Sequence, residues 1–251
     1  MNVHAAVTVV IPMAGDGHRF REAGYQLPKP FVDVRGAAMI ERIIENIALP
    51  DARYILIARQ EHIEAQQQIV ADLERRYPCE FVTLSQKTEG TAATILFARH
   101  RFRGDRPLLI ANADQLVDGG CAEMVRHALE RELDGCIMTF EEPTRNPKWS
   151  FARVDDRGFV VEVREKVAIS THATVGIYYF RRGDEFVDAA TQMIISNDRT
   201  NGEFYTCPVY NYLIAMGRKV GTWEIPAACM HGLGTPADLI AYLARHAPAL
   251  G

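Results

Sequence analysis

The residues of this chain best suited to chemistry lie in the loop after its first apolar run, residues 7–11. The loop contains two glycines, Gly15 and Gly17, followed by Arg19 and by Lys29, which stands between two prolines. Glycines let backbone N–H groups approach phosphate oxygens closely, and an arginine and a lysine can neutralise phosphate charge. The pattern therefore indicates a polyphosphate site. The alternative is a tight strand–helix turn with two surface cations, because the loop matches neither GxGxxG nor a Walker sequence.

A second candidate is Asp114, which follows the apolar run 108–111. Ligands of open α/β sheets bind at the carboxyl ends of strands, and a carboxylate there can hold Mg²⁺ between phosphate oxygens. We interpret Asp114 as a magnesium ligand, because it would converge with Gly15 and Gly17 at one edge of the sheet. The alternative is an aspartate that caps the following loop.

Three further groups are weak signals when each is taken alone. Gln86 offers a donor and an acceptor for the edge of a base, and it precedes Gly90 and Thr91 at the start of an expected helix. An ordinary helix cap would explain Gly90 and Thr91 equally well. Glu165–Lys166 and Glu203 are, by themselves, typical of surface charges.

Alternating strands and helices are expected to hold these residues in place. Apolar runs predict buried strands, and apolar residues at helical spacing predict helices. The first half gives strands at 7–11, 31–34, 54–58, 81–84, 108–111 and 135–140, and helices near 39–47, 63–77, from 91 onward, and 122–132. This alternation predicts an α/β protein, a Rossmann-like three-layer α/β/α fold with a mostly parallel mixed sheet.

The pattern changes after residue 141. The second half predicts a hairpin at 151–163, a strand at 175–180, a helix at 184–196, a turn-rich segment at 201–206, a helix near 210–216, a strand at 219–224 and a last helix from Pro236, capped by Thr235. We expect one domain over 1–251, with a nucleotide-binding half over about 1–140 and an acceptor-binding half over about 141–251.

Composition argues against several classes of protein. The formal net charge of -4 and the pI near 6.1 disfavour a nucleic-acid or membrane-surface protein. The five cysteines form no CxxC pair, and no basic segment precedes the first apolar run, so we expect reduced thiols in a cytoplasmic protein without signal peptide or membrane span. The histidines show no HxH or HExxH spacing and no GxSxG occurs, which disfavours a zinc site or a serine hydrolase.

In this order, the segments resemble the sugar-phosphate nucleotidylyltransferases, the NTP transferase family that makes nucleotide-activated sugars. The most specific part is the opening loop, where Ala14-Gly15-x-Gly17-x-Arg19-Phe20 and Pro28-Lys29-Pro30 match the family's glycine-rich loop and Pro-Lys-Pro. The similarity covers nearly the whole chain and looks closest to a subgroup found beside capsule and surface-polysaccharide genes. It implies the nucleotide-diphospho-sugar transferase fold, Mg²⁺ as cofactor, and a reaction of a nucleoside triphosphate with a small phosphorylated acceptor. Many members form homo-oligomers.

The resemblance also implies roles for residues of this chain. Arg19 would bind the β- and γ-phosphates, Lys29 would hold the α-phosphate and the acceptor phosphate, and Lys166 would attract the acceptor phosphate. Asp114 corresponds to the aspartate that binds the metal. The implied nucleotide-binding residues are Met13, Ala14, Gly15, Gly17, Gln86, Gly90 and Thr91, and the implied acceptor-binding residues are Trp149, Ser150, Glu165, Val175 and Glu203.

One position departs from the family pattern. Many relatives carry a second metal-binding Asp two residues before a Gly-Thr pair, and here that position is Gly232, with His231 and Asp238 as nearby candidates to replace it. A cytidylyltransferase for a non-sugar phosphate such as choline phosphate stays open, as does a non-catalytic nucleotide-binding protein. A glycosyltransferase of the same general fold usually carries a DxD motif, whereas only Asp114 stands at this strand end.

Overall fold

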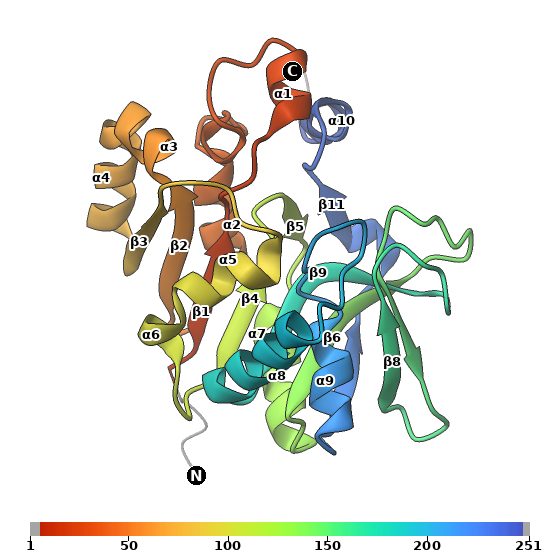
Figure 1. Cartoon of the computed structure of the whole chain (residues 1–251). Helices are drawn as coiled ribbons and strands as arrows, with labels where there is room; N and C mark the ends of the chain where they lie inside the picture. The colour runs from red at the N-terminus through yellow and green to blue at the C-terminus, as the bar shows by residue number, and fades with distance from the viewer. Residues whose placement is uncertain (1–5, 248–251) are drawn as a thin grey trace.

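The computed structural model describes residues 6–247 and is built around one mixed β-sheet (Figure 1). Its nine strands include a path in the order β10-β6-β9-β4-β1-β2-β3, and the β7–β8 hairpin joins at β9. The path contains β1 (Thr8–Pro12), β2 (Arg53–Arg59), β3 (Cys79–Leu84), β4 (Leu108–Ala111), β6 (Gly135–Glu141), β9 (His172–Phe180) and β10 (Val220–Glu224). Only β9 runs antiparallel to its neighbours on this path. The predicted mostly parallel mixed sheet is confirmed.

Helices cover both faces of the sheet, which confirms the three-layer arrangement. One buried cluster joins the sheet to α2 (Met39–Ile47), α4 (Gln67–Arg76) and α7 (Cys121–Glu130), and the other joins it to α5 (Thr91–Phe97), α8 (Gly183–Ile195) and α9 (Val209–Ala215). The remaining elements are α1 (His18–Glu22), η1 (Lys29–Phe31), α3 (Gln60–Ala65), α6 (Arg99–Phe102), β5 (Gln115–Val117), β7 (Phe151–Val154), β8 (Val160–Arg164), η2 (Ala227–Cys229), β11 (Met230–Gly232) and α10 (Pro236–Arg245).

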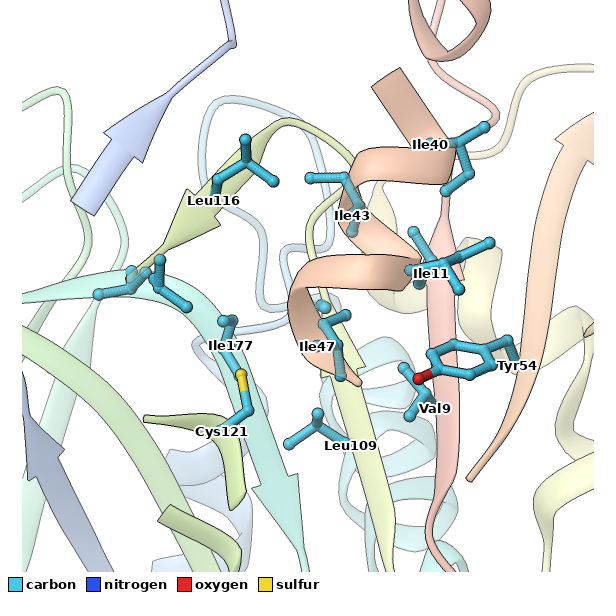
Figure 2. Packing of buried hydrophobic residues seen from close by; sticks show 14 of the residues in the cluster. Val9, Ile11, Ile40, Ile43, Ile47, Tyr54, Leu109, Leu116, Cys121 and Ile177 are labelled. Carbon is cyan, nitrogen blue, oxygen red and sulfur yellow. The ribbon is translucent and has the colours of Figure 1, made fainter. Parts of the chain in front are cut away.

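The central strand β1 shows why the first apolar run is continuous. Val9 and Ile11 face the cluster that contains Ile43 and Ile47 of α2 (Figure 2), whereas Val10 faces the opposite cluster. A strand buried on both faces needs apolar side chains at consecutive positions rather than at alternate ones. Burying each such side chain stabilises the fold by roughly 1.5–3 kcal/mol. The loop after β1 therefore begins from a firmly held strand end.

The predicted strand at 31–34 is wrong. Residues Lys29–Phe31 form the 3₁₀ helix η1, in which Phe31 N donates to Pro28 O (2.8 Å), and a tight turn follows with Val34 N donating to Ala37 O (2.7 Å). The segment is apolar because Phe31 and Val34 enter the core, but the prolines lack the N–H groups that a ladder requires.

Other differences concern boundaries and small elements. The helix predicted at 63–77 is two helices, α3 and α4, which meet at Gln66 in a non-helical backbone conformation (φ -129°, ψ 35°). Strand β9 starts at His172 instead of residue 175, and the two-stranded sheet of β5 and β11 was not predicted. The expected cap of the last helix is confirmed, because Thr235 and Asp238 form a reciprocal capping box.

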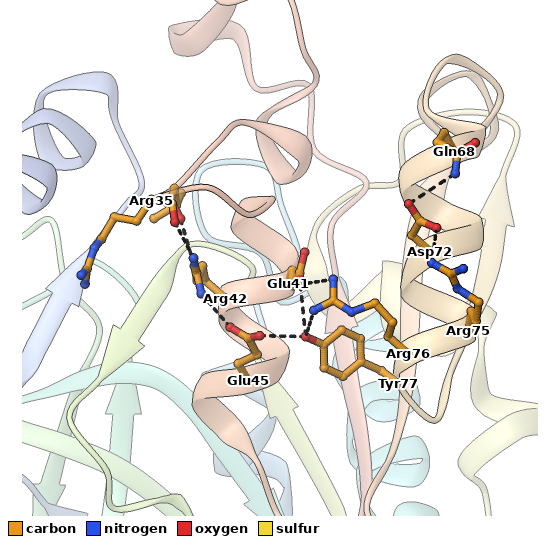
Figure 3. A network of polar contacts seen from close by, with 10 residues as sticks. Arg35, Glu41, Arg42, Glu45, Gln68, Asp72, Arg75, Arg76 and Tyr77 are labelled. Carbon is orange, nitrogen blue, oxygen red and sulfur yellow. Dashed lines mark hydrogen bonds and ion pairs between the residues drawn. The ribbon is translucent and has the colours of Figure 1, made fainter.

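A polar network on one edge of the fold braces the chain that follows η1 (Figure 3). Arg42 of α2 donates to Val34 O (2.9 Å) and pairs with Glu45 (2.9 Å), while Tyr77 donates to Glu45 (2.8 Å). Arg76 of α4 pairs with Glu41 of α2 at 2.5 Å. The network links α4, α2 and the turn after η1, and so it supports the segment that presents Lys29.

Two other expectations can be compared with the structure. The five cysteines all lie within the described residues and have free thiols. Across residues 6–247, the helices are too short or too polar for any of them to span a bilayer.

Candidate active site

A cleft of about 400 Å³ opens where β1 and β4 end, and segments from both halves of the sequence line it. Its walls come from the loop after β1, from η1, from the segment after β4, and from the chain around β7, β8, β9 and α9. The lining residues that matter below are Met13, Gly15, Gly17, Arg19, Lys29, Thr91, Asn112, Asp114, Gln115, Lys148, Trp149, Ser150, Glu165, Gly176, Tyr178, Tyr205, Thr206 and Cys207. The predicted convergence of the glycine loop with Asp114 is therefore present.

The glycine loop is shaped so that Lys29 can approach it. Gly17 has φ 58°, in the left-handed region, and a Cβ there would stand 3.2 Å from the Cβ of Lys29. Gly15 has open space where a Cβ would be, which leaves its backbone accessible from the cleft. Arg19 lines the same cleft from α1, whereas Ala14 is buried and does not. The loop thus presents backbone and two cations to one space.

Lys29 and Asp114, which both line the cleft, form an ion pair. The ammonium Nζ of Lys29 lies 2.5 Å from Oδ2 of Asp114, and the two side chains are 17% and 27% exposed. The ammonium also lies 5.7 Å from the ring centroid of Phe20. Asp114 is fixed through its backbone, because its carbonyl accepts a hydrogen bond from Leu233 N (2.7 Å) beside the β5–β11 sheet. The loop after β1 and the segment after β4 are therefore joined by a charged pair.

Part of the cleft lining is polar and buried. The hydroxyl of Ser150 donates to the carboxylate of Glu165, which is 9% exposed. Burial raises the pKa of Glu165, while the Ser150 hydrogen bond and the charge of Lys166 oppose that rise. Burial also raises the pKa values of Tyr178 and Cys207, which line the cleft as neutral groups. Ser150 and Glu165, which were each expected to bind the acceptor, are brought together here.

Trp149 also lines the cleft. Its ring packs edge-on against Phe140, with centroids 5.2 Å apart, and the ammonium of Lys148 lies 4.6 Å from the Trp149 ring. Lys148, which the sequence analysis did not single out, adds a third cation to the lining after Arg19 and Lys29.

Lys166 does not line the cleft itself. Its ammonium donates to the hydroxyl of Tyr205 (2.7 Å) and lies 4.5 Å from the centroid of that ring. Tyr205 does line the cleft, next to Thr206 and Cys207. Sequence reasoning missed Tyr205, and only its position two residues after Glu203 could have drawn attention to it.

Four other predicted residues lie outside the cleft lining. Gln86 borders a separate hollow of about 340 Å³, and Val175 is buried while its neighbour Gly176 lines the cleft. Gly90 has φ 121°, and a Cβ there would stand 2.5 Å from the backbone of Phe204.

Glu203 lies 3.7 Å from Lys87, which also pairs with Asp16 of the glycine loop (3.2 Å). The side chain of Thr91 accepts hydrogen bonds from the backbone N–H (3.1 Å) and hydroxyl (2.9 Å) of Thr206. The capping role considered for Thr91 is taken instead by Gly90, which occupies the N-cap of α5 and makes no side-chain bond.

The neighbourhood of Gly232 explains what can and cannot replace a second metal-binding aspartate. Asp238 Oδ2 accepts from Thr235 in the capping box, and His231 lies 2.9 Å from Asp118. Within residues 6–247, no group of three or more His, Cys, Asp or Glu side chains could hold a metal ion. Among these residues, neither Asp238 nor His231 lines the cleft with Asp114, where the other carboxylate is Glu165.

Comparisons with known proteins relate this chain to one protein family. A family model described as nucleotidyl transferase matches residues 8–207. The bifunctional protein GlmU of Methanococcus aeolicus is 26% identical over 207 residues, 75% of this chain and 47% of that protein. GlmU of Methanocaldococcus jannaschii is 20% identical over 210 residues, 77% of this chain and 48% of that protein. The chain spans about half the length of these curated relatives.

Solved structures share the fold. A nucleoside-diphosphate-sugar pyrophosphorylase from Vibrio cholerae RC9 is 24% identical with a TM-score of 0.80, covering 94% of this chain and 99% of that one. The inositol-1-phosphate CTP transferase from T. maritima is 15% identical with a TM-score of 0.76, covering 96% and 95%. These similarities confirm the expected nucleotide-diphospho-sugar transferase fold.

Proposed function

Because this chain belongs to the nucleotidyl transferase family and is a nucleotidyltransferase, we propose that it condenses a nucleoside triphosphate with a sugar phosphate. An oxygen of the acceptor phosphate attacks the α-phosphorus in line. The bond between the α-phosphorus and the oxygen of the β-phosphate breaks, and pyrophosphate leaves with the bonding electron pair. The product is a nucleotide-activated sugar.

The observation that carries this proposal is the Lys29–Asp114 pair in a cleft shared by both halves of the chain. Gly15, Gly17 and Arg19 line the same cleft, together with the buried Ser150–Glu165 pair. A triphosphate bound by the glycine loop and an acceptor bound near Glu165 would meet beside Lys29. The cleft therefore contains groups suited to bind both substrates, with Lys29 next to the bond that forms.

On the nucleotide side, the proposed roles follow from position. Arg19 binds the β- and γ-phosphates and stabilises the departing pyrophosphate, because a guanidinium can engage two phosphate oxygens at once. Lys29 contacts the α-phosphate and the acceptor phosphate. The backbone at Gly15 and Gly17 approaches the phosphates without a Cβ in the way. Met13 and Thr91, which also line the cleft, border the nucleoside.

The donor set fits Mg²⁺. Magnesium sites in phosphate-transferring enzymes usually use one or two carboxylates and complete the coordination with phosphates and water. Asp114 supplies one carboxylate that reaches the cleft, and in this structure that carboxylate is paired with the Lys29 ammonium. Mg²⁺ held by Asp114 would neutralise charge on the phosphates of the triphosphate.

On the acceptor side, Glu165 accepts hydrogen bonds from acceptor hydroxyls, and Trp149 and Ser150 border the sugar. An acceptor phosphate is anionic already, so the reaction needs no protein nucleophile and no general base. The chain contributes orientation and charge neutralisation, which together can account for large rate enhancements. The resemblance to the capsule-associated subgroup supports surface-polysaccharide synthesis as the use of the product.

A pyrophosphate-release screen tests the proposal. CTP, UTP, dTTP, GTP and ATP are each crossed with sugar, polyol and amino-alcohol phosphates in the presence of Mg²⁺, and the product is identified by mass. We expect pyrophosphate and a nucleotide-activated product from at least one pair that includes a sugar phosphate. Removing one charged contact to the transition state costs about 2.7–4 kcal/mol, so Lys29→Ala should lower kcat about a hundredfold or more. No release with any pair would overturn the proposal, and release only with amino-alcohol phosphates would reassign the acceptor.

A further inference from the structure

Tyr205 stands between Lys166 and the cleft. Lys166 was expected to reach the acceptor phosphate directly, yet it is Tyr205 that lines the cleft. Resting on the function proposed above, we propose that the hydroxyl of Tyr205 binds the acceptor phosphate and that Lys166 acts as a positioning residue through Tyr205. The assignment adds a binding residue that neither the sequence nor the comparisons suggested.

The backbone is held in place on both sides of Tyr205. Phe204 N donates to Glu89 O (2.7 Å), and Thr206 N donates to the side chain of Thr91 (3.1 Å), so the segment is pinned to the start of α5. The Lys166 ammonium then fixes the ring twice, through the hydroxyl and through the ring face 4.5 Å away. A half-buried tyrosine held in this way can present its hydroxyl in one direction.

The hydrogen-bond inventory leaves the hydroxyl proton of Tyr205 for an anion. A phenol has one donor and two acceptor positions, and an ammonium has donors only. Lys166 must therefore occupy an acceptor position of the hydroxyl, and its positive charge strengthens the remaining O–H as a donor. Glu203 is the competing acceptor for that proton, and it also lies 3.7 Å from Lys87.

The same arrangement assigns the hydroxyls and the phosphate of the acceptor to different side chains. Glu165 and Lys166 are consecutive, but their side chains engage different partners, Ser150 for Glu165 and Tyr205 for Lys166. The carboxylate can then receive neutral hydroxyls while the tyrosine receives the phosphate. Lys166 has φ 56°, a left-handed conformation uncommon for a residue other than glycine, and it stands next to Glu165 in the chain.

Steady-state kinetics with Tyr205→Phe, Lys166→Met and the double variant tests this inference, using glucose 1-phosphate as the acceptor probe. A hydrogen bond to a charged group, when lost, should raise the KM for the acceptor about tenfold to a hundredfold in Tyr205→Phe and leave the KM for the triphosphate within about twofold. Lys166→Met should have a similar effect alone but add less than about threefold in the Tyr205→Phe background, because residues that act through one contact are not additive. Tyr212→Phe is the matched control: Tyr212 lies on α9, its hydroxyl donates to Asp198, and its loss should change neither KM.

A second measurement does not depend on turnover. With 3-fluorotyrosine incorporated in place of Tyr205, the fluorine resonance should shift when inorganic phosphate is added, and the shift should shrink in Lys166→Met. Fully additive kinetic effects would show that Lys166 contacts the acceptor independently and would overturn the inference. An unchanged acceptor KM in Tyr205→Phe, or a fluorine signal insensitive to phosphate, would overturn it as well. If the wild-type protein releases no pyrophosphate with any pair, the proposed function fails, while the fluorine titration still decides the role of Tyr205.

Discussion

Replacing Gly90 by alanine tests whether this glycine serves the fold or a ligand. Gly90 has φ 121° and ψ 172°, a combination that is essentially restricted to glycine. A Cβ there would stand 2.5 Å from both the backbone N and the backbone O of Phe204. Phe204 N donates to Glu89 O (2.7 Å), and Phe204 O accepts from Ala92 N (2.9 Å). Because both atoms are held by these hydrogen bonds, they cannot move aside at low cost.

Gly90→Ala should destabilise the fold for two reasons, backbone strain and overpacking. A residue held in a glycine-only backbone region costs about 1–3 kcal/mol, and overpacking typically costs about 1–3 kcal/mol more. We therefore expect Gly90→Ala to lower the free energy of unfolding by about 4 kcal/mol, a fall in Tm of about 10 °C for a chain of this length. Gly217→Ala is the matched control, because Gly217 also has a positive φ (76°) but a Cβ there meets nothing within 4 Å. Its cost should be about 1 kcal/mol.

Chemical denaturation and calorimetry of both variants measure the difference, and triphosphate binding is measured at a temperature where both are folded. A Gly90→Ala protein as stable as Gly217→Ala would refute the packing argument. If stability were unchanged while triphosphate affinity fell, Gly90 would serve the nucleoside, as the resemblance implies. A large loss of stability would instead assign Gly90 to the contact with Phe204.

Three further predictions concern the cleft. Lys29→Met should tighten the binding of Mn²⁺ to the protein without nucleotide by about tenfold, because it removes the ammonium that now pairs with Asp114; calorimetry measures this, and unchanged affinity would count against competition for that carboxylate. Gly232→Asp should also tighten metal binding, since a Cβ at this position has open space and an aspartate would restore the second carboxylate of many relatives; an unaltered titration would argue that position 232 does not face the metal. Burial raises the pKa of Glu165, so the folded state binds this proton more tightly than the unfolded state does, and the free energy of unfolding should fall as pH rises from the ordinary value of 4.5 through the raised one. Glu165→Gln should remove that fall and be more stable than the wild type at neutral pH. Chemical denaturation at several pH values measures this, and an identical dependence of the unfolding free energy on pH in the two proteins would contradict the reasoning.

The sequence was sufficient for the fold because its strongest signals are periodic and local. The run that becomes β1 is apolar at every position, as burial on both faces requires, and the helix that becomes α2 carries its isoleucines at helical spacing. The convergence of Asp114 with Gly15 and Gly17 was also predictable, because the carboxyl ends of neighbouring parallel strands lie at one edge of a sheet. Topology, once it is known, brings these residues together.

What sequence reasoning missed depends on contacts through space. The apolar segment 31–34 has the composition of a strand, but the prolines before it deny it a ladder, so burial alone was misleading. Similarly, nothing in the sequence shows that Lys166 turns toward Tyr205 while Glu165 turns toward Ser150. The approach of Phe204 to Gly90 is equally invisible in the sequence, because it joins segments far apart in the chain.

The glycine at position 232 has a consequence for how the cleft balances charge. Among the described residues that line the cleft, the carboxylates are Asp114 and Glu165, and Glu165 is bonded to Ser150. Gly232 pairs with Gln115 in the β5–β11 sheet, beside the chain that carries Asp114, so an aspartate there would add a negative charge near the phosphates. Without it, Asp114 and the triphosphate itself would be the charged ligands for Mg²⁺ under the proposed function, and metal affinity would then depend on bound nucleotide. In this structure the Lys29 ammonium supplies the positive charge beside Asp114, and a divalent cation bound there would free that side chain to contact the phosphates.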